Sequence, residues 1–461
     1  MERTRRMARN GTLIIGGGFG GAHVARLLGK AGATIVNPDT AMLYTPLLPE
    51  VAAGAIEPRH AVVPLRQLCP HAELLRGQAV ALDEAARYVT VETELGSVDV
   101  EYERLVIALG STARMLPTPG LAEQAITFKN VGDAIQLRNH VLRQLDLADA
   151  DPSNARRYLR FVFVGAGYAG VEALAEVRQL LADTWRHYPR LRDIQPHWVL
   201  VNAAPKILAE VPGRLGYDAA RQLHRDGVDI RPSTTLHSVE SNAVTLSDGT
   251  RLDTNTLVWT AGVIPAPLIS QLSLPLDERG RIIVGPCLQV EGRTNVWAIG
   301  DCAAVPNAAT PNQTDPPTCQ HALRQARQLV KALRGDDQPY RYRSLGQGAT
   351  LGRLKGIASV GGVGIRGILA AAIVRWYHIS QVPELSRALR IIADSALSLM
   401  FGRDGAELPG IDVQPATASR ARSQPVTARV FQHERPTHRP GTALGLPGAR
   451  PAALSALHSS R

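Results

Sequence analysis

Cysteine is scarce in this chain of 461 residues. The four cysteines lie far apart in the sequence, at Cys69, Cys287, Cys302 and Cys319. No CxxC or CxxxxC pair occurs among them. We therefore expect neither a disulfide framework nor a redox-active dithiol.

Long apolar runs are also absent. No window of about 20 uncharged apolar residues occurs, so no helix is expected to span a bilayer. The N-terminus "MERTRRMARN" is basic but leads directly into "GTLIIGGG" without the apolar run of a signal peptide, so export is not expected. The last histidines, His433, His438 and His458, lack the spacing of metal ligands, and no metal site is predicted.

The charge is uneven along the chain. The formal net charge is +10, and residues 341–461 account for all of it, with 16 basic and 6 acidic residues. A basic excess at one end favours an anionic partner, either nucleic acid or a membrane surface. No nucleic-acid motif or aromatic-interleaved basic stripe accompanies the excess, so an anionic lipid surface is the favoured partner and no nucleic acid is predicted.

The first informative motif is "TLIIGGGFGGAHVARLL". An apolar strand leads into Gly16, Gly18 and Gly21, spaced as GxGxxG, and a helix with apolar periodicity follows. One glycine allows a tight turn, the next lets backbone amides approach a pyrophosphate, and the third lets the helix pack on the strand. A glycine turn without any nucleotide is the alternative for one such motif alone.

The same unit occurs again about 150 residues later, in "RFVFVGAGYAGVEALAEV". Gly165, Gly167 and Gly170 follow a strand and precede a helix. Two complete motifs in the correct context favour two dinucleotides over two coincidental turns. Two bound dinucleotides indicate electron transfer between a nicotinamide and a flavin.

Three further strands end at glycine. "NVWAIGD" places Gly300 and Asp301 after an apolar strand, where a carboxylate can accept a hydrogen bond from a ribityl hydroxyl; a helix N-cap aspartate is the alternative. "RLVIALGS" and "TLVWTAGVIP" end at Gly110 and Gly262 and have the character of connections that cross between two domains.

Taken together with "LYTPLLPEVAAG" and the late "ATLGR" and "WYH" segments, these motifs resemble the type II NADH:quinone oxidoreductases, within the two-dinucleotide-binding-domain flavoproteins. The resemblance covers roughly residues 11–410. It implies an α/β fold with two Rossmann-like dinucleotide-binding domains, the FAD domain being split in sequence by the NAD(P)H domain, and a C-terminal amphipathic helical membrane-binding region. The implied boundaries are 10–125 and 268–345 for FAD, 126–267 for NAD(P)H, 346–410 for the membrane region and 411–461 for a disordered basic tail.

The resemblance also assigns residues. It implies cofactor contacts at Gly16, Gly18, Phe19, Gly20, Gly21, Asn37, Pro46, Leu47, Gly110, Gly165, Gly167, Tyr168, Gly170, Asn202, Gly262, Gly300 and Asp301. It places Glu172 near the contact of nicotinamide and flavin and Gln320 near the quinone, as the catalytic residues. A first-turn glutamate that only suits the helix dipole is the alternative for Glu172.

The chain departs from the family at three positions. Asn37 and Asn202 replace acidic residues that hold the riboses of FAD and NADH, and Arg324 replaces one glutamine of the quinone region, where Gln320 and Gln325 are kept. An asparagine at position 202 does not repel a 2′-phosphate, and Lys206 supplies positive charge nearby. We therefore hypothesise that NADPH is accepted alongside NADH.

The C-terminal region predicts two helices. Leu385, Leu389, Ile392, Ala396 and Leu399 repeat along one helical face, and the segment around Trp376 predicts an earlier helix. A lipid-facing pair is favoured by the basic excess; packing on the FAD domain or in a homodimer interface is the alternative.

The sequence thus predicts a non-proton-pumping FAD-dependent NAD(P)H:quinone oxidoreductase, attached to the cytoplasmic, inner face of a cell membrane. Two alternatives stay open. One is a reductase whose acceptor is a small iron–sulfur protein that docks on the basic end. The other is a redox-sensing flavoprotein that turns over slowly.

Overall fold

The computed structural model describes residues 5–7, 11–211, 213–344 and 346–408. The predicted tail, 411–461, lies outside the described residues. The described helices of at least eight residues are α1 (Phe19–Leu28), α5 (Val131–Ala150), α7 (Tyr168–Thr184), α8 (Leu215–Arg225), α9 (Cys319–Leu333), α10 (Ile368–Ser380) and α11 (Leu385–Phe401). Short helices include α2 (Leu48–Ala52), α3 (Leu65–Leu68), α4 (Leu121–Gln124) and α6 (Ala155–Tyr158).

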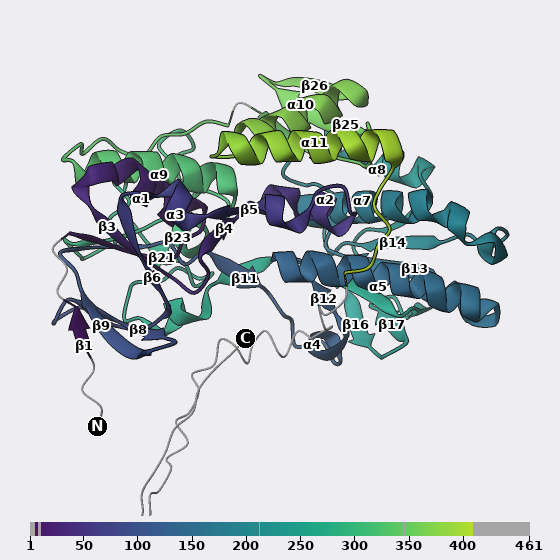
Figure 1. Ribbon diagram of the computed structural model, residues 1–461, viewed down its shortest axis with the longest axis horizontal. Coiled ribbons are helices and arrows are strands. Elements are labelled where there is room, and N and C mark those ends of the chain that lie inside the picture. The colour runs from purple at the N-terminus through teal and green to yellow at the C-terminus, as the bar shows by residue number, and fades with distance from the viewer. Residues whose placement is uncertain (1–4, 8–10, 212, 345, 409–461) are drawn as a thin grey trace, which may run out of the picture. The chain divides into compact units, whose positions relative to one another are not determined.

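A five-stranded parallel sheet forms the first dinucleotide-binding domain (Figure 1). Its order is β22 (Val296–Ala298), β10 (Arg104–Ile107), β2 (Thr12–Ile15), β3 (Ala33–Asn37) and β6 (Ala72–Arg76). β2 is buried along its whole length, as expected for a strand covered on both faces. Because β22 comes almost 190 residues after β10 but pairs with it in parallel, this domain is split in sequence, as predicted.

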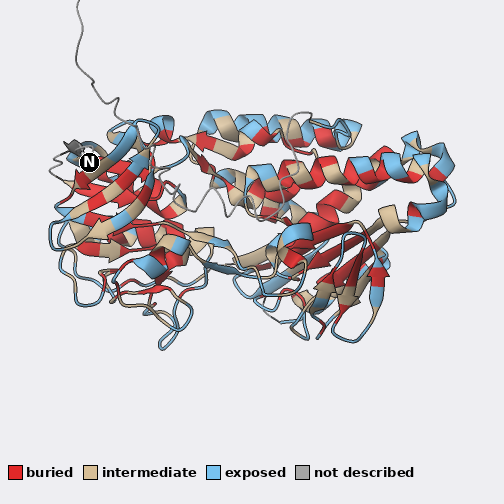
Figure 2. Ribbon diagram, turned by 90° about the horizontal axis from the view of Figure 1, so that it is seen from below, coloured by how far each residue is buried: buried red, intermediate tan, exposed pale blue. Residues whose placement is uncertain are grey.

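A second five-stranded parallel sheet lies within the interrupting segment. Its order is β12 (Ile126–Thr127), β19 (Thr256–Trp259), β13 (Arg160–Val164), β14 (His197–Val201) and β15 (Val228–Arg231). Figure 2 shows the strands of both sheets largely buried beneath their helices. The predicted α/β fold with two Rossmann-like domains is confirmed. The residue boundaries of the domains stay predictions.

Smaller antiparallel sheets complete these layers. One joins β1 (Arg5–Met7), β9 (Gly96–Glu101), β8 (Tyr88–Thr93) and β7 (Gln78–Asp83), where β1 alone pairs in parallel, and another joins β16 (Leu236–Val239), β17 (Ala243–Leu246) and β18 (Arg251–Asp253). The two segments expected to cross between domains pair with each other, as β11 (Ser111–Ala113) and β20 (Val263–Pro265). This antiparallel ribbon follows the strands that end at Gly110 and Gly262.

The C-terminal region folds as a three-stranded sheet followed by two helices. The strands are β24 (Gly346–Thr350), β25 (Gly356–Val360) and β26 (Val363–Arg366), and α10 packs against them. In Figure 1, α10 and α11 lie along the edge of the molecule above α2 and α7. Both helices predicted for this region are therefore confirmed, at Ile368–Ser380 and Leu385–Phe401.

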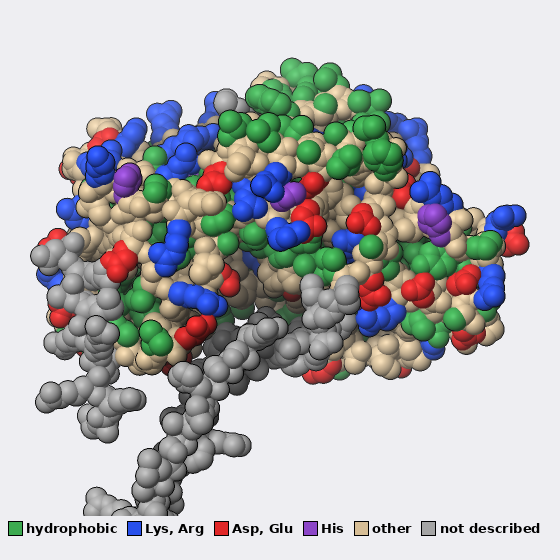
Figure 3. Space-filling model, viewed as in Figure 1, with side chains coloured by type: hydrophobic (Ala, Val, Ile, Leu, Met, Phe, Trp, Pro, Cys, Tyr) green, Lys and Arg blue, Asp and Glu red, His purple; other side chains and the backbone are tan. Residues whose placement is uncertain are grey.

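Helix α11 packs with its polar side inward. Asp394 receives hydrogen bonds from the amide of Glu57 at 3.1 Å and lies 2.5 Å from Nδ1 of His60, while Ser395 accepts one from Arg375. The predicted apolar face points outward, with Leu385 76% exposed. Figure 3 shows hydrophobic side chains gathered over α10 and α11. None of the described helices is long and apolar enough to cross a membrane.

Candidate functional site

The first glycine turn has the geometry that its spacing predicts. Gly16 lies at φ +106°, and a Cβ there would be 2.2 Å from the carbonyl oxygen of Ala108. A Cβ on Gly21 would be 1.9 Å from the oxygen of Gly16. A Cβ on the exposed Gly18 would meet no atom within 4 Å. The turn therefore presents open backbone at the start of α1, where a pyrophosphate fits.

The second turn repeats this geometry in the other domain. Gly165 also has φ +106°, and a Cβ on Gly170 would be 1.9 Å from the oxygen of Gly165. Gly167 is the open position, directly before α7. The hydroxyl of Thr260, at the end of β19, donates to the carbonyls of Val164 and Gly165, each at 2.9 Å. The two turns are thus equivalent sites for two dinucleotides.

The two asparagines that replace acidic residues bind backbone in both turns. Asn37 accepts a hydrogen bond from the amide of Gly17 at 2.7 Å and donates to the carbonyl of Asp39 at 2.8 Å. Asn202 accepts from the amide of Ala166 at 3.2 Å and donates to two carbonyls in its own loop, each at 2.9 Å. Each side chain therefore joins a glycine turn to the loop after the next strand. An ionised carboxylate in the same place could accept from the turn but could not donate to the loop carbonyls.

Asp301 lies in a short polar chain at the end of β22. Its carboxylate accepts a hydrogen bond from the hydroxyl of Ser111 at 2.5 Å, and Nζ of Lys129 lies 3.0 Å from that hydroxyl and 3.8 Å from the carboxylate. The preceding residue, Gly300, has φ +76°. The carboxylate predicted to contact the ribityl chain is thus held in place by the hydroxyl of Ser111, from the crossing segment, and by the ammonium group of Lys129.

The two domains meet where α2 packs on α7, one turn after the second glycine turn. Glu172 is buried there, and its carboxylate accepts hydrogen bonds from the amide and hydroxyl of Thr350, at 2.8 and 3.1 Å. Burial, with a smaller contribution from the nearby Glu50, raises the pKa of Glu172 from 4.5 to about 8, although the bonds from Thr350 oppose the shift. Glu172 therefore carries a proton at neutral pH.

Two more carboxylates are buried beside it, and C-terminal arginines approach both. Glu50, on α2, lies 3.6 Å from the guanidinium of Arg375. Glu176 is fully buried one turn after Glu172 and forms an ion pair with Arg403. Burial raises the pKa of Glu176, and Arg403 opposes that shift. The junction thus contains three carboxylates and two arginines in a region with little access to water.

Helix α9 presents the residues expected near a quinone. Gln320 lies half-buried in its first turn, next to Cys319. Gln325 is buried, and its amide accepts from the backbone of Gly300 at 2.8 Å and donates to Asp315 at 3.0 Å. The guanidinium of Arg324 lies over the ring of Tyr342, 5.4 Å from its centre. Among the described residues, the side-chain amide of Gln325 thus has hydrogen-bond partners within the protein, whereas none is found for that of Gln320.

The four cysteines do not form a redox pair. All are free, and burial of Cys319 raises the pKa of its thiol to about 12. A reactive thiol needs the opposite shift.

The loop expected to approach the flavin ring, around Pro46 and Leu47, continues into α2. Leu47 is buried and Pro46 half-buried. The ring of the preceding Tyr44 is tilted against that of Phe19, with ring centres 5.4 Å apart, and its hydroxyl donates to the carbonyl of His378 in α10 at 2.8 Å. This loop therefore joins the first glycine turn to the C-terminal helices.

Sequence reasoning missed the partners of the predicted residues. Ser111 ends the motif "RLVIALGS" and Thr350 lies within "ATLGR", whereas Lys129, Arg375 and Arg403 come from segments that carry no motif of their own. Glu176 had a local signal, because it lies four residues after Glu172 and therefore on the same face of α7.

The two glycine turns predict different effects of one added methyl group. Gly170→Ala should lower the thermal midpoint strongly, because its Cβ would overlap the oxygen of Gly165. Gly167→Ala should leave the midpoint of the nucleotide-free protein unchanged but weaken NADH binding, because the space at this position is reserved for the pyrophosphate. Thermal unfolding and an NADH fluorescence titration check both. Wild-type affinity in Gly167→Ala would remove the assignment of this turn.

Glu172 predicts a pH dependence of stability. In the folded protein it keeps a proton up to about pH 8, whereas the unfolded chain releases it near pH 4.5. The contribution of this group to the free energy of unfolding should therefore be complete below pH 4.5 and be lost as the pH rises to about 8. Glu172→Gln keeps an acceptor for Thr350 and should flatten the fall of the thermal midpoint between pH 5 and 8. The exposed Glu278→Gln is the matched control and should follow the wild type.

Comparison with known proteins agrees with this geometry. Residues 11–326 match the pyridine nucleotide-disulphide oxidoreductase family. The chain is 30% identical over 423 residues to the type II NADH:quinone oxidoreductase NdhA of Mycobacterium tuberculosis, covering 85% of this chain and 87% of that protein. It is 29% identical over 421 residues to Ndh of the same organism, covering 86% and 89%.

Solved structures show the same fold. NDH2 from Plasmodium falciparum in complex with NADH superposes with a TM-score of 0.79 at 16% sequence identity, covering 88% of this chain and all of that one. The structure of that enzyme with RYL-552 gives 0.80 over the same coverage. With two equivalent glycine turns, a split first domain and these relatives, the chain belongs to the type II NADH:quinone oxidoreductases of the pyridine nucleotide-disulphide oxidoreductase family.

Proposed function

We propose that this protein is an FAD-dependent NAD(P)H:quinone oxidoreductase that does not pump protons. The observation that carries the proposal is the junction of α2 and α7. There, α2 of the first dinucleotide-binding domain packs against α7, the helix that begins at the second glycine turn. The protonated Glu172 of α7 is buried in this contact. Bound FAD supplies the redox chemistry, accepting a hydride from the nicotinamide and passing two electrons to a quinone.

The side chains and backbone of the protein have two roles: they position the cofactors and supply protons to the quinone. The open turns at Gly18 and Gly167 would hold the two pyrophosphates, and Asp301, held by Ser111, would contact the ribityl chain. Glu172 holds a proton in a site that excludes water, and quinone reduction consumes protons. Gln320 has an amide available to hydrogen-bond a quinone carbonyl.

Acceptance of both nucleotides follows from the loop after β14. Asn202 is uncharged, and its side-chain amide is hydrogen-bonded to backbone groups. It therefore does not repel a 2′-phosphate as a carboxylate would. Lys206, in the same loop, is exposed and close in sequence. The protein therefore oxidises NADH and is expected to oxidise NADPH as well.

The C-terminal helices provide the attachment to a membrane. The outward side chains of α10 and α11 are apolar, including Trp376 at 70% and Leu389 at 56% exposure. Such a surface is costly in water and favourable at a lipid boundary. We place the protein peripherally on an anionic membrane at its inner face, where an apolar quinone reaches Gln320. The alternative of a homodimer through this face is an outcome of the vesicle experiment below.

The redox function is tested by anaerobic mixing of the purified flavoprotein with NADH or NADPH, followed by a short-chain quinone. Both nucleotides should bleach the visible flavin band, and quinone should restore it. Asn202→Glu should keep the NADH reaction and slow the NADPH reaction by about tenfold, because a carboxylate repels the 2′-phosphate.

Each other outcome has a meaning. Bleaching without recovery by quinone would contradict the quinone reductase and favour an iron–sulfur protein as acceptor. Slow bleaching with no acceptor that restores the band would favour the redox-sensing alternative. Equal NADPH rates in wild type and Asn202→Glu would contradict the role given to position 202.

Membrane attachment is tested by a charge placed in the apolar face. Leu389→Glu should weaken binding to phospholipid vesicles by at least about tenfold, because a leucine leaves the lipid boundary and a carboxylate enters it. Co-sedimentation with vesicles measures the loss.

The matched control is Leu95→Glu. Leu95 is 98% exposed in the turn between β8 and β9, away from the C-terminal helices, and its change should leave vesicle binding as in the wild type. If Leu389→Glu binds vesicles like Leu95→Glu but changes the mass in solution, the face is a dimer interface instead.

A further inference from the structure

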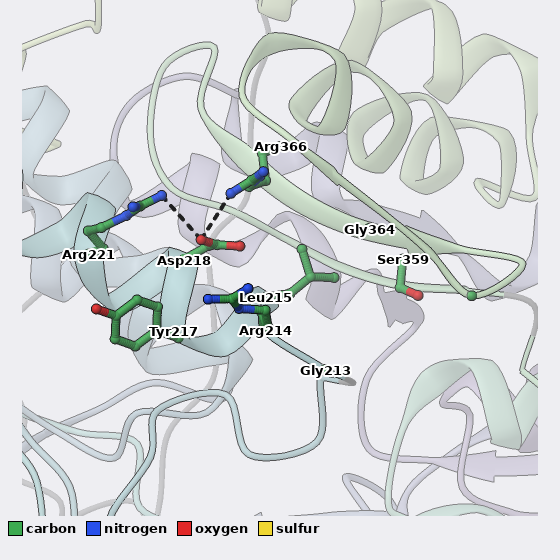
Figure 4. Close-up of a pocket in the computed structure, with 10 residues that line it drawn as sticks. Gly213, Arg214, Leu215, Tyr217, Asp218, Arg221, Ser359, Gly364 and Arg366 are labelled. Atoms are coloured by element: carbon green, nitrogen blue, oxygen red, sulfur yellow. Dashed lines mark hydrogen bonds and ion pairs between the residues drawn. The ribbon is translucent and has the colours of Figure 1, made fainter.

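A pocket of about 440 Å³ lies between the start of α8 and the hairpin of β25 and β26 (Figure 4). Its residues are Gly213, Arg214, Leu215, Tyr217, Asp218 and Arg221 on one side and Ser359, Gly362, Gly364 and Arg366 on the other. Gly364 of the hairpin lies next to Leu215 of α8; a Cβ on Gly364 would be in ordinary van der Waals contact with that side chain, at 3.4 Å.

Three arginines and one aspartate give this pocket a net charge of +2. Oδ1 of Asp218 accepts from Arg221 at 3.3 Å and from Arg366 at 3.1 Å, as Figure 4 shows. Asp218 is thus the point that holds guanidinium groups from two elements side by side. Each guanidinium has five N–H donors and uses one nitrogen here, so most of its donors stay available.

Arg214 adds a third cation at the N-terminal end of α8. Its side chain is exposed and has no hydrogen bond or ion pair within the described part of the chain. Exposed arginines beside one another repel, and an anion between them relieves that repulsion. Paired guanidinium groups bind phosphate oxygens in a bidentate manner.

Exposed apolar side chains lie beside the pocket, both on the hairpin and at the start of α10. Val363 on the hairpin is 65% exposed and Tyr217 is 66% exposed. Arg366 is followed by Gly367 and then by Ile368, the first residue of α10, which is 65% exposed. A ligand phosphate in the pocket would therefore have apolar protein surface directly beside it.

The pocket is separate from the second dinucleotide turn. The loop between β14 and α8 lies between them: the amide of Leu208 donates to the carbonyl of Ala166 in the turn at 2.8 Å. On its other side, the oxygen of Ile207 lies 3.0 Å from the Cβ position of Gly216 in α8. The pyrophosphate position at Gly167 is thus on the opposite side of this loop.

We propose that this pocket binds the phosphodiester headgroup of an anionic phospholipid. The single negative charge of a phosphodiester suits a net charge of +2 that already includes a carboxylate, and the acyl chains would continue over the exposed side chains of Val363 and Ile368. The bound headgroup would fix how α10 lies on the bilayer. The inference rests on the proposed membrane attachment, but its test does not need a bilayer.

The experiment is calorimetric titration of the full-length flavoprotein with dihexanoyl phosphatidylglycerol, below the concentration at which this lipid forms micelles. The wild type should bind it. Arg366→Gln and Arg214→Gln should each bind at least about tenfold more weakly, since each loses a charge-assisted hydrogen bond to phosphate. Arg214→Gln removes no side-chain hydrogen bond or ion pair among the described residues, and an unchanged thermal midpoint would show that its loss of binding does not come from unfolding.

The matched control is Arg390→Gln, which removes an equal charge from the exposed surface of α11 and should bind as the wild type does. Equal binding by all four proteins, or no binding by the wild type, would overturn the proposal. Inorganic phosphate that binds as tightly as the lipid would also overturn it, by showing a simple anion site.

Vesicles separate this proposal from the membrane proposal. The wild type should bind vesicles that contain phosphatidylglycerol more tightly than vesicles of phosphatidylcholine alone. Arg366→Gln should lose this difference but still bind phosphatidylcholine vesicles. Leu389→Glu should lose both. A wild type that binds no vesicle but binds the soluble lipid would remove the membrane attachment and leave the headgroup site.

Discussion

Three carboxylates are buried where the two dinucleotide-binding domains meet, and burial of a charge is tolerated only when the charge is neutralised or paired. Glu172 is neutralised by keeping its proton, with its oxygen bonded to Thr350. Glu176 is paired with Arg403, and Glu50 lies beside Arg375. All three partners come from residues after 345. The C-terminal region therefore supplies a hydrogen-bonding or charged partner to each of the three carboxylates.

This constraint also explains which face of α11 is exposed. The helix supplies Asp394 to His60 and Ser395 to Arg375, so its polar side must face the protein. The apolar side is left outside, the reverse of what a helix on a water-soluble surface does. Arg390 is an exposed polar residue of α11, but Asp394 and Ser395 face inward while Leu385 and Leu389 are exposed. The same inward contacts thus leave an apolar face of α11 at the surface.

Much of the fold could be predicted because its signals are local. In each GxGxxG motif the first glycine has φ +106°, and the last one lets the helix pack at contact distance. These two requirements allow few backbone conformations, and both motifs form the same turn. The periodicity of α11 showed which residues share its apolar face. It did not show whether that face packs against the protein or lies at the surface. Whether an apolar stripe faces the core or the solvent depends on partners such as His60, more than 330 residues away.

The candidate site was predicted less completely for the same reason. Asp301 and Glu172 stand beside motifs, but Ser111 lies 190 residues before Asp301 and Thr350 lies 178 residues after Glu172. Spacing along a sequence carries no information about such pairs. Gln325 shows the converse: its place in a motif suggests the quinone, whereas its amide bonds Gly300 and Asp315 and stabilises the strand end that presents Asp301.

The two asparagines extend this argument to the nucleotides. A carboxylate at position 37 or 202 could still accept from the glycine turn, but it would face the carbonyl oxygens that the amide now donates to, at Asp39 or at Ala204 and Lys206. Two like partial charges at less than 3 Å repel, so an acidic residue would have to turn away from the loop and toward a ribose. Asparagine lets the loop close on itself instead. In both turns the asparagine thus ties the loop to the chain's own backbone through donated hydrogen bonds that a carboxylate could not make.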